Sequence, residues 1–250
     1  MPRVSEPAIA VSGLTKRFKE TTAVDGVSFA IPAGATAALL GGNGAGKTTT
    51  IAMLLGLVRP TSGRICILGR DFAHHAKSLL ARMNFQSPYA DLPRRLTVRQ
   101  NLKIYALLYG VADARARIES LAKDLDLGDL LDRPLGELSA GQRTRAGLAK
   151  AFVNRPEIVL LDEPTASLDP DTADWVRGFL ERYAREVHAT FLIASHNMFE
   201  VERLCDQVLM MRQGRIVDSG SPKELIAKYG RTNLEDVFLD VARHRREPQP

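Results

Sequence analysis

A glycine-rich run between residues 41 and 48 constrains this chain more than any other feature. It reads Gly41-Gly42-Asn43-Gly44-Ala45-Gly46-Lys47-Thr48 and fits the pattern G-x-x-x-x-G-K-[ST]. In such a loop the glycines let consecutive backbone N–H groups turn inward on a phosphate, the lysine bridges two phosphates, and the last hydroxyl can ligate Mg²⁺. A glycine-rich turn that binds nothing is the alternative interpretation.

The flanking segments favour phosphate binding over an empty turn. Residues 36–40 read as a short buried strand that enters the loop. Apolar residues at helical spacing follow the loop until Pro60: Ile51, Leu54, Leu55 and Val58. A strand, a glycine loop and a helix together aim a helix N-terminus at an anion. The sequence therefore predicts a phosphate-binding loop.

The positive charge of the chain is concentrated in one segment. The 250 residues carry a net charge of +5. Between residues 94 and 123, seven cations face only Asp113 and Glu119, so this segment alone has an excess of seven minus two, or five. The cations are Arg94, Arg95, Arg99, Lys103, Arg115, Arg117 and Lys123. A solvated helical surface, an anionic membrane face and nucleic acid all fit this pattern. Few aromatic residues lie among the cations, whereas a base-stacking platform for nucleic acid would require them.

Nothing in the composition indicates secretion or a membrane span. Cys66 and Cys205 lie in apolar runs without metal-ligand spacing, which is typical of buried, reduced thiols. The N-terminus has no apolar signal core, and no apolar stretch approaches the ~18 residues of a membrane span. We therefore expect a soluble chain in the cytoplasm.

The pattern of apolar residues predicts mixed α/β structure. Residues 9–31 alternate as short antiparallel strands, with Asp25-Gly26 as the turn signal. Residues 87–155 have helical spacing and read as an inserted helical subdomain. Residues 158–161 and 190–194 are apolar runs typical of central parallel strands. Polar pairs follow them, Asp162-Glu163 and Ser195-His196, and ligands bind at such strand ends. We expect these pairs and the glycine loop to converge on one nucleotide.

Two carboxylates fit the needs of phosphoryl transfer to water. Such a reaction needs a phosphate cradle, a metal, a group that activates water and a stabiliser of the developing charge. Asp162, at the end of an apolar strand, is a candidate Mg²⁺ ligand. Glu163 is the candidate water-activating base, with an ordinary surface carboxylate as the alternative.

The order of motifs along the chain resembles the ATP-binding cassette ATPases over residues 8–229. After the glycine loop come Gln86, the pentapeptide Leu138-Ser139-Ala140-Gly141-Gln142, the pair Asp162-Glu163, then Ser167-Leu168-Asp169, and finally His196. The resemblance implies an α/β fold with a P-loop NTPase core of mainly parallel sheet, an N-terminal antiparallel β subdomain and an inserted α-helical subdomain. The implied ATPase domain spans residues 5–229, with the helical subdomain at about 87–155, followed by a C-terminal helix and basic tail over 230–250.

The same resemblance implies roles for particular residues. Glu163, His196 and Gln86 would be catalytic, and Thr48, Asp162 and Gln86 would serve Mg²⁺. Ser139 and Gly141 would grip the γ-phosphate of ATP bound to a second copy of the chain. Gln142 would also bind nucleotide, and Asp169 would cross the dimer interface. Thr49 would bind nucleotide beside the glycine loop. Phe18 would stack on adenine, although its spacing from Val11 and Leu14 also fits a core position. For His196 the alternative is an ordinary buried histidine.

Ser139 is also suited physically to its implied role. It can cap the helix that follows and present the positive helix end to an anion. The chain departs from the family pattern at two positions. Ala140 stands where the family usually has glycine, and Gln100 stands where a glutamate is common. Neither change removes an implied γ-phosphate ligand or the base.

Two segments resemble the ATPase subunits of small exporters that pair with a separate permease. These are residues 97–111 and the ending 232–239, where Asn233 and Asp236 resemble a helix cap. Leu234, Val237, Phe238 and Val241 would form the apolar face of that last helix. The implied function is ATP-driven export by a homodimer that needs ATP and Mg²⁺ and lies on the inner face of the cell membrane. The alternatives are a soluble cassette ATPase acting on ribosomes or nucleic acid, and a nucleotide-gated module without catalysis. We expect no nucleic-acid partner, because the chain has one glycine loop and no heptad run.

Overall fold

The computed structural model describes residues 6–87, 92–166 and 168–242. Ser167 and the basic tail after residue 242 lie outside the described residues. The chain divides into two compact units, Met1–Leu80 with Thr190–Pro250, and Ala81–Ala189. Each unit is described by itself.

The first unit contains an antiparallel sheet in the strand order β2-β1-β4-β5. Its second strand alternates buried and exposed residues over most of its length, so one face packs inward. The inward residues Ile9, Leu14 and Ile31 are fully buried. The strands are β1 (Pro7–Phe18), β2 (Thr21–Pro32), β4 (Ser62–Ile67) and β5 (Arg70–Asp71).

A second set of strands in this unit carries the glycine loop. Strand β3 (Thr36–Leu40) lies between β8 (Thr190–Ala194) and β9 (Gln207–Arg212), parallel to both. Every residue of β3 and β8 is buried, as the continuous apolar runs predict. Strand β10 (Arg215–Gly220) pairs antiparallel with β9 and forms a hairpin with it. Leu39 lies opposite Ala194, so the loop after β3 and the Ser195-His196 pair start from the same sheet edge.

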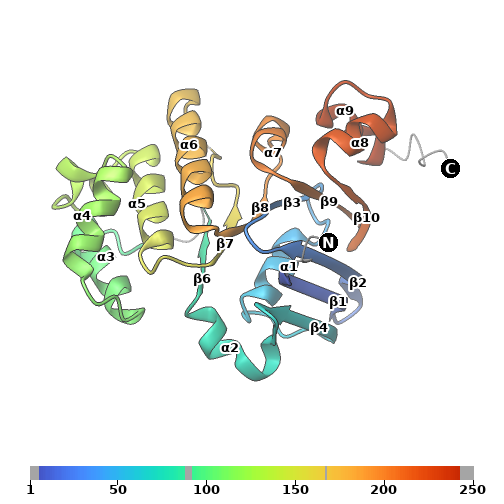
Figure 1. The fold of residues 1–250 in the computed structure, drawn as a ribbon, viewed down its shortest axis with the longest axis horizontal. Coiled ribbons are helices and arrows are strands. Elements are labelled where there is room, and N and C mark those ends of the chain that lie inside the picture. The colour runs from blue at the N-terminus through green and yellow to red at the C-terminus, as the bar shows by residue number, and fades with distance from the viewer. Residues whose placement is uncertain (1–5, 88–91, 167, 243–250) are drawn as a thin grey trace. The chain divides into compact units, whose positions relative to one another are not determined.

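The described residues of the first unit also form five helices. Helix α1 follows the glycine loop, α7 follows Ser195-His196, and α8 and α9 lie side by side after β10 (Figure 1). Leu234 and Val237 of α9 are fully buried, so the predicted apolar face of the last helix docks on the domain. The helices are α1 (Lys47–Leu54), α2 (Phe72–Leu80), α7 (Met198–Leu204), α8 (Pro222–Tyr229) and α9 (Leu234–Ala242).

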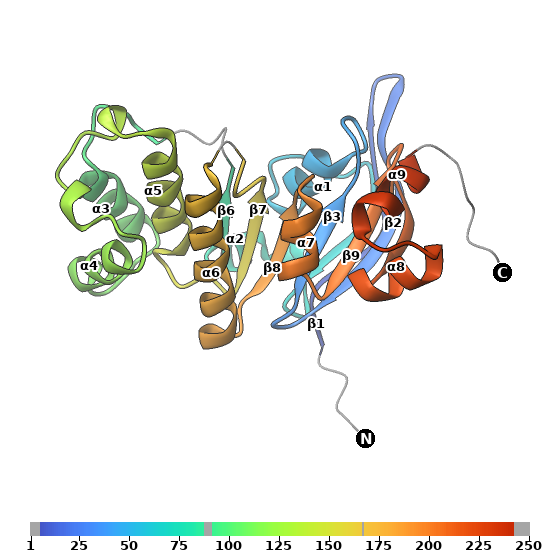
Figure 2. The same ribbon diagram turned by 90° about the horizontal axis from the view of Figure 1, so that it is seen from above.

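The second unit combines a parallel strand pair with helices. Strand β6 (Met83–Gln86) pairs with β7 (Ile158–Asp162). Helices α3, α4 and α5 group together in both views (Figures 1 and 2). Phe152 of α5 is fully buried against two aromatic rings of α6, those of Phe179 and Tyr183. The helices are α3 (Val98–Leu108), α4 (Ala114–Asp124), α5 (Ala140–Phe152) and α6 (Pro170–Val187), with short 3₁₀ turns at Gly128–Leu130 and Leu135–Glu137.

Two local expectations were wrong. The chain does not turn at Asp25-Gly26 but between Phe18 and Thr21, where Lys19 takes a φ of 49°. Gly26, with a φ of 64°, instead lies at a β-bulge inside β2, where the pairing shifts between β1 and β2. Helix α1 ends at Leu54 rather than near Pro60, because Gly56 takes a φ of 70° that only glycine adopts without strain.

Candidate functional site

The glycine loop in the first unit is shaped by close backbone approaches. A Cβ atom on Gly41 would lie 2.5 Å from the Met211 carbonyl oxygen of β9. Gly46 has a φ of 105°, and a Cβ there would lie 2.6 Å from the Ala23 carbonyl oxygen. Only glycine fits at these two positions, so the glycines serve packing against β2 and β9 as well as phosphate access. Helix α1 begins directly after Gly46, and its first N–H groups have no intrahelical acceptors.

Lys47 folds back over the loop that precedes it. Its Nζ donates to the Gly41 carbonyl at 2.5 Å and to the Gly42 carbonyl at 3.3 Å. Thr48 is exposed beside it, and Thr49 is half-buried. The ammonium group and the N-terminus of α1 together place positive charge at the loop, which is suited to the phosphates of a nucleotide.

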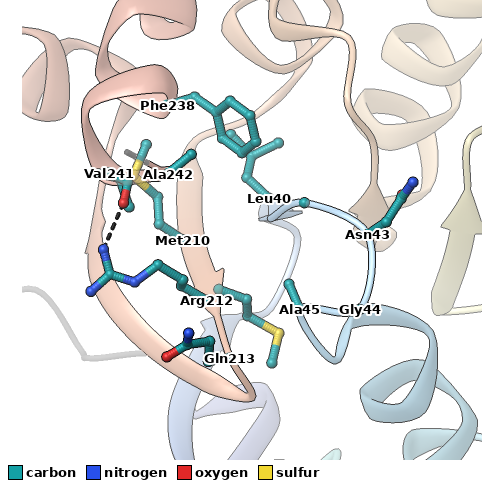
Figure 3. Close-up of a pocket in the computed structure, with 12 residues that line it drawn as sticks. Leu40, Asn43, Gly44, Ala45, Met210, Arg212, Gln213, Phe238, Val241 and Ala242 are labelled. Atoms are coloured by element: carbon teal, nitrogen blue, oxygen red, sulfur yellow. Dashed lines mark hydrogen bonds between the residues drawn. The ribbon is translucent and has the colours of Figure 1, made fainter. Parts of the chain in front are cut away.

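The hairpin of β9 and β10 braces this loop. The Gly214 N–H at the hairpin turn donates to the Ala45 carbonyl at 3.0 Å. A pocket of about 200 Å³ lies beside the loop, between the end of β9 and helix α9 (Figure 3). It is lined by Gly42, Asn43, Gly44 and Ala45 of the loop, by Leu40 and residues 210–213, and by Phe238, Val241 and Ala242.

His196 follows a buried polar network that the sequence did not predict. The Ser195 hydroxyl donates to Glu200 Oε2 at 2.7 Å, and both residues are fully buried. The Asn197 N–H donates to the same hydroxyl, and its side chain caps α7. Because a buried carboxylate must be hydrogen-bonded, this network fixes the backbone around His196. His196 itself is exposed, so the buried-histidine alternative is wrong.

Phe18 lies at the end of β1 with 47% of its surface exposed. The core alternative for this residue is therefore wrong. The Lys16 ammonium lies 4.8 Å from the ring centroid, within cation–π distance. An exposed aromatic face of this kind is available for stacking, and the adenine role of Phe18 stays a prediction.

In the second unit, Gln86 packs against α5, the helix that begins within the Leu138–Gln142 pentapeptide. Gln86 is the last residue of β6 and is 6% exposed. A Cβ atom on Gly147 of α5 would lie 2.5 Å from Gln86 Nε2, so the glycine makes room for this side chain. The Lys150 ammonium of α5 donates to the Phe85 carbonyl at 2.9 Å, and burial lowers the pKa of Lys150. Gln86 and α5 are thus held together.

Asp162 and Glu163 lie at the carboxyl end of β7, both half-buried. Glu163 has a φ of 50°, a conformation that is uncommon for a residue other than glycine. The Ala166 N–H donates to its carbonyl at 3.1 Å and closes a turn. Other non-glycine residues such as Leu68 and Arg155 share this conformation, so the catalytic role of Glu163 stays a prediction.

Ser139 caps α5, as predicted. Its hydroxyl accepts from the Gln142 N–H at 3.2 Å, while Gln142 Oε1 accepts from the Ser139 N–H at 2.9 Å. This reciprocal arrangement is a capping box, and its signal was the spacing Ser-x-x-Gln. Ser139 and Ala140 are exposed, and Gly141 is half-buried beside Thr172 of α6. The exposed N-terminus of α5 can therefore receive an anion.

Asp169 caps α6 with its side chain. Its Oδ1 accepts from the Thr172 N–H at 3.0 Å, and this hydrogen bond lowers the pKa of Asp169. The side chain is exposed. The structure shows the capping contacts of Ser139, Gln142 and Asp169. Their roles in nucleotide binding stay predictions.

The residues predicted to serve Mg²⁺ are, each taken by itself, of a chemical type that suits the ion. The Thr48 hydroxyl, the Asp162 carboxylate and the Gln86 amide all offer the hard oxygen ligands that Mg²⁺ prefers. Over residues 6–87, 92–166 and 168–242, no group of three or more His, Cys, Asp and Glu side chains could hold a metal alone. Mg²⁺ usually takes one or two protein ligands plus substrate oxygens, so these residues fit the ion.

The cysteines and the basic segment were also considered in the sequence analysis. Cys205 is buried and Cys66 half-buried, both as free thiols. Within the part of the chain that the structure describes, no helix is both long and apolar enough to cross a membrane. Arg99 of the basic segment pairs with Asp132 and Glu119, and Arg117 donates to the carbonyls of Phe152 and Val153. Part of the basic segment therefore serves internal structure.

Comparison with known proteins gives consistent matches. The family model described as "ABC transporter" matches residues 24–166. "Nod factor export ATP-binding protein I" of Ralstonia nicotianae is 36% identical over 241 residues, which cover 94% of this chain and 74% of the relative. The protein of the same name from Burkholderia lata is 39% identical over 217 residues, with 84% and 70% covered.

Solved structures agree with the sequence matches. An ATP-binding subunit of an ABC transporter superposes with a TM-score of 0.85 at 24% identity, covering 94% of this chain and 99% of that one. The cbiO1 subunit of the Clostridium perfringens cbiONQ transporter complex gives 0.80 at 30% identity, with 90% and 92% covered. A cassette solved as a dimer in a post-hydrolysis state with ADP and Pi gives 0.78 at 21%, with 85% and 98% covered. The predicted fold class is confirmed.

Proposed function

We propose that two copies of this chain bind two ATP molecules between them and power export through a separate permease. The premise is that the chain belongs to the ABC transporter family and is one of its ATPases. Supporting observations come from both units. One chain carries a single glycine loop and a single exposed α5 N-terminus, each suited to an anion. The relatives from Ralstonia and Burkholderia are named for export, and the relative with ADP and Pi was solved as a dimer.

The proposed binding step rearranges Lys47. Its ammonium group donates to the carbonyls of Gly41 and Gly42, and the β- and γ-phosphates would replace these acceptors. The N–H groups of the first turn of α1 would donate to the same phosphates. Phe18 would stack on the adenine ring. When bound, Mg²⁺ would neutralise phosphate charge, with Thr48 and Asp162 as its protein ligands and Gln86 close to it.

In the proposed hydrolysis step, Glu163 accepts a proton from the attacking water. The water oxygen forms a bond to the γ-phosphorus as the bond from that phosphorus to the ADP oxygen breaks. Gln86 orients the water, and His196 stabilises the charge on the transferred phosphoryl group. The partner's Ser139 and Gly141 would grip the same γ-phosphate at the N-terminus of α5. Asp169 would contribute across the same interface.

The proposed permease contact lies on helix α3. Ile104, Leu107 and Leu108 form one stripe of this helix at i, i+3 and i+4, with exposures of 44%, 64% and 73%. Lys103 on this helix and Arg95 just before its start are exposed cations. An apolar stripe with a basic margin fits a short amphipathic helix of the permease next to an anionic membrane surface. The chain would then sit on the cytoplasmic face of the membrane.

Mixed dimers test whether the ATP site is composite. Ser139→Ala and Lys47→Ala chains are each expected to be nearly inactive. A heterodimer of the two has one intact site, formed by the glycine loop of the first and Ser139 of the second, and should recover part of the ATPase activity. The matched control mixes Lys47→Ala with Glu163→Gln, which leaves no intact site. No recovery in the co-purified test heterodimer, or equal recovery in the control, would contradict the composite site.

A further inference from the structure

Helix α9 is attached at both ends to elements that lie next to proposed nucleotide-site residues. At its start, the Leu234 N–H donates to Glu202 Oε1 of α7 at 2.6 Å. At its end, Arg212 Nη1 donates to the Val241 carbonyl at 2.6 Å, a bond that Figure 3 marks. Arg212 is the last residue of β9. Such charge-assisted bonds are stronger than neutral ones and hold their partners in a defined geometry.

Each attachment lies within a few residues of a segment that contacts or belongs to the proposed nucleotide site. On the α7 side, His196 precedes the Asn197 cap of the helix that carries Glu202. On the β9 side, the residue before Arg212 is Met211, whose carbonyl lies against Gly41 of the glycine loop. The turn that follows Arg212 holds the same loop, through the hydrogen bond from the Gly214 N–H to Ala45.

The helix is rigid enough to transmit position. Its inner residues Leu234 and Val237 are fully buried. Arg231 makes two hydrogen bonds to Asp240, at 2.8 and 2.9 Å, and this carboxylate is only 5% exposed. Asn233 caps the first turn, since its Oδ1 accepts from the Asp236 N–H at 2.8 Å. A capped and buried helix moves as one body.

A pocket of about 200 Å³ lies between α9 and the glycine loop (Figure 3). Phe238 and Val241 of the helix line it together with Leu40, Gly42 and Gly44. A further connection from α9 to the glycine loop runs through Arg212 and the hairpin turn.

We propose that α9 is a positioning element for ATP hydrolysis, with Arg212 and Glu202 as its two positioning residues. Arg212 holds the hairpin turn and thereby the shape of the glycine loop, so it acts on nucleotide affinity. Glu202 holds α7 and thereby the segment of His196, so it acts on the rate of hydrolysis. The Glu202 half rests on the proposed role of His196, whereas the Arg212 half rests only on ATP binding by the glycine loop.

The test separates the two halves by their kinetic signatures. Arg212→Ala is expected to raise KM for ATP, and the dissociation constant of a fluorescent ADP analogue, about three- to tenfold with kcat nearly unchanged, since about 1.4 kcal/mol corresponds to tenfold. Arg212→Lys keeps a donor and should restore affinity. Glu202→Ala should lower kcat about threefold or more with KM nearly unchanged. Glu202→Gln keeps the acceptor oxygen and should behave like the wild type.

Controls distinguish positioning from simple stabilisation. Arg64→Ala removes an exposed ion pair with Asp71 in the same unit and should change neither constant. Hydrogen exchange of the peptide covering residues 41–46 should accelerate in Arg212→Ala and stay unchanged in Arg64→Ala. If Arg212→Ala melts at a lower temperature but keeps wild-type KM and loop exchange, α9 is a cover and the proposal is overturned. Should Arg212→Ala not fold, Arg212→Gln is measured in the same way.

His196→Ala tells a failure of this proposal from a failure of the proposed function. If His196→Ala abolishes turnover and Glu202→Ala does not lower kcat, the Glu202 half is overturned while the role of His196 stands. If His196→Ala keeps wild-type turnover, the proposed role of His196 fails and the Glu202 half fails with it. The Arg212 half is decided independently by the nucleotide titration.

Discussion

Replacing Gly147 with alanine tests how Gln86 is held against α5. The added Cβ would lie 2.5 Å from Gln86 Nε2 and 2.9 Å from its Cδ, well inside normal contact distance. Gln86 is only 6% exposed, so its side chain has little room to retreat. Gly147→Ala should therefore displace Gln86 from its position on the helix.

The expected stability change is a balance of two effects. Alanine in place of glycine inside a helix gains about 1 kcal/mol of helix propensity. Overpacking a filled site costs about 1–3 kcal/mol. The free energy of unfolding of Gly147→Ala should thus fall by about 0–2 kcal/mol. Gly178→Ala in α6 is the matched control, because the nearest atom to its added Cβ is Arg182 Nη1 at 3.6 Å. The control should gain about 1 kcal/mol, or about 2–4 °C in Tm.

Thermal melting and steady-state ATPase assays read both consequences. Gly147→Ala should reduce kcat about tenfold or more, because Gln86 is proposed to orient the attacking water. Adding Gln86→Ala to Gly147→Ala removes the clash, so the double variant should be at least as stable as Gln86→Ala alone. The reasoning is refuted if Gly147→Ala is as stable as Gly178→Ala and hydrolyses ATP at the wild-type rate.

Three further predictions concern separate parts of the chain. Lys47→Ala should lose ATP affinity, because its Nζ lies at the loop carbonyls of Gly41 and Gly42, where the phosphates are proposed to bind. Wild-type affinity in a fluorescent-nucleotide titration would contradict the phosphate role. Burial raises the pKa of Tyr183 to about 12, whereas an unfolded tyrosine ionises near pH 10. The unfolded state therefore loses its proton first, and the folded state should lose about 2–3 kcal/mol between pH 10 and 12. Tyr183→Phe should remove this alkaline loss in urea titrations, and an unchanged pH slope would count against it. Arg95→Glu with Lys103→Glu should weaken flotation with permease-containing vesicles while the purified chain keeps its ATPase; unchanged flotation would retire the membrane-facing assignment, and loss of nucleic-acid binding instead would favour the soluble alternative.

The local parts of the site were readable from the sequence because short-range chemistry dictates them. The glycine loop follows a buried strand and precedes a helix, so its conformation depends on neighbours within a few residues. The cap at Ser139 depends only on the next three residues. The apolar strands ending at Leu40 and Ala194 carry their own signal in uninterrupted runs.

Features set by distant contacts were not readable. The turn between β1 and β2 was misplaced, because β1 also pairs with β4, and this pairing helps to set the register that leaves Gly26 in a bulge. Glu200 occupies a helix position that looks solvent-facing, yet it is fully buried against the Ser195 hydroxyl. The Arg212 contact joins residues 29 positions apart. No local pattern signals such a pair.

Arg99 shows why the number of cations in a segment overestimates the positive charge that its surface offers to a partner. The sequence places it in a basic segment, but its guanidinium bridges Asp132 and Glu119, and these contacts raise the pKa of Arg99 and lower that of Asp132. It therefore ties α3 to the rest of its unit. A test of the membrane-facing surface must leave Arg99 unchanged, since its reversal would disturb the unit itself.

The most direct test of the composite ATP site is the oligomeric state of Glu163→Gln. This change keeps the shape of the side chain and removes the proposed base, so ATP should bind without being hydrolysed. Light scattering after size-exclusion chromatography should show a dimer in ATP and Mg²⁺, and a monomer in ADP and Mg²⁺. Steady-state hydrolysis should be absent. Wild-type turnover by Glu163→Gln, or a monomer in ATP, would contradict the account.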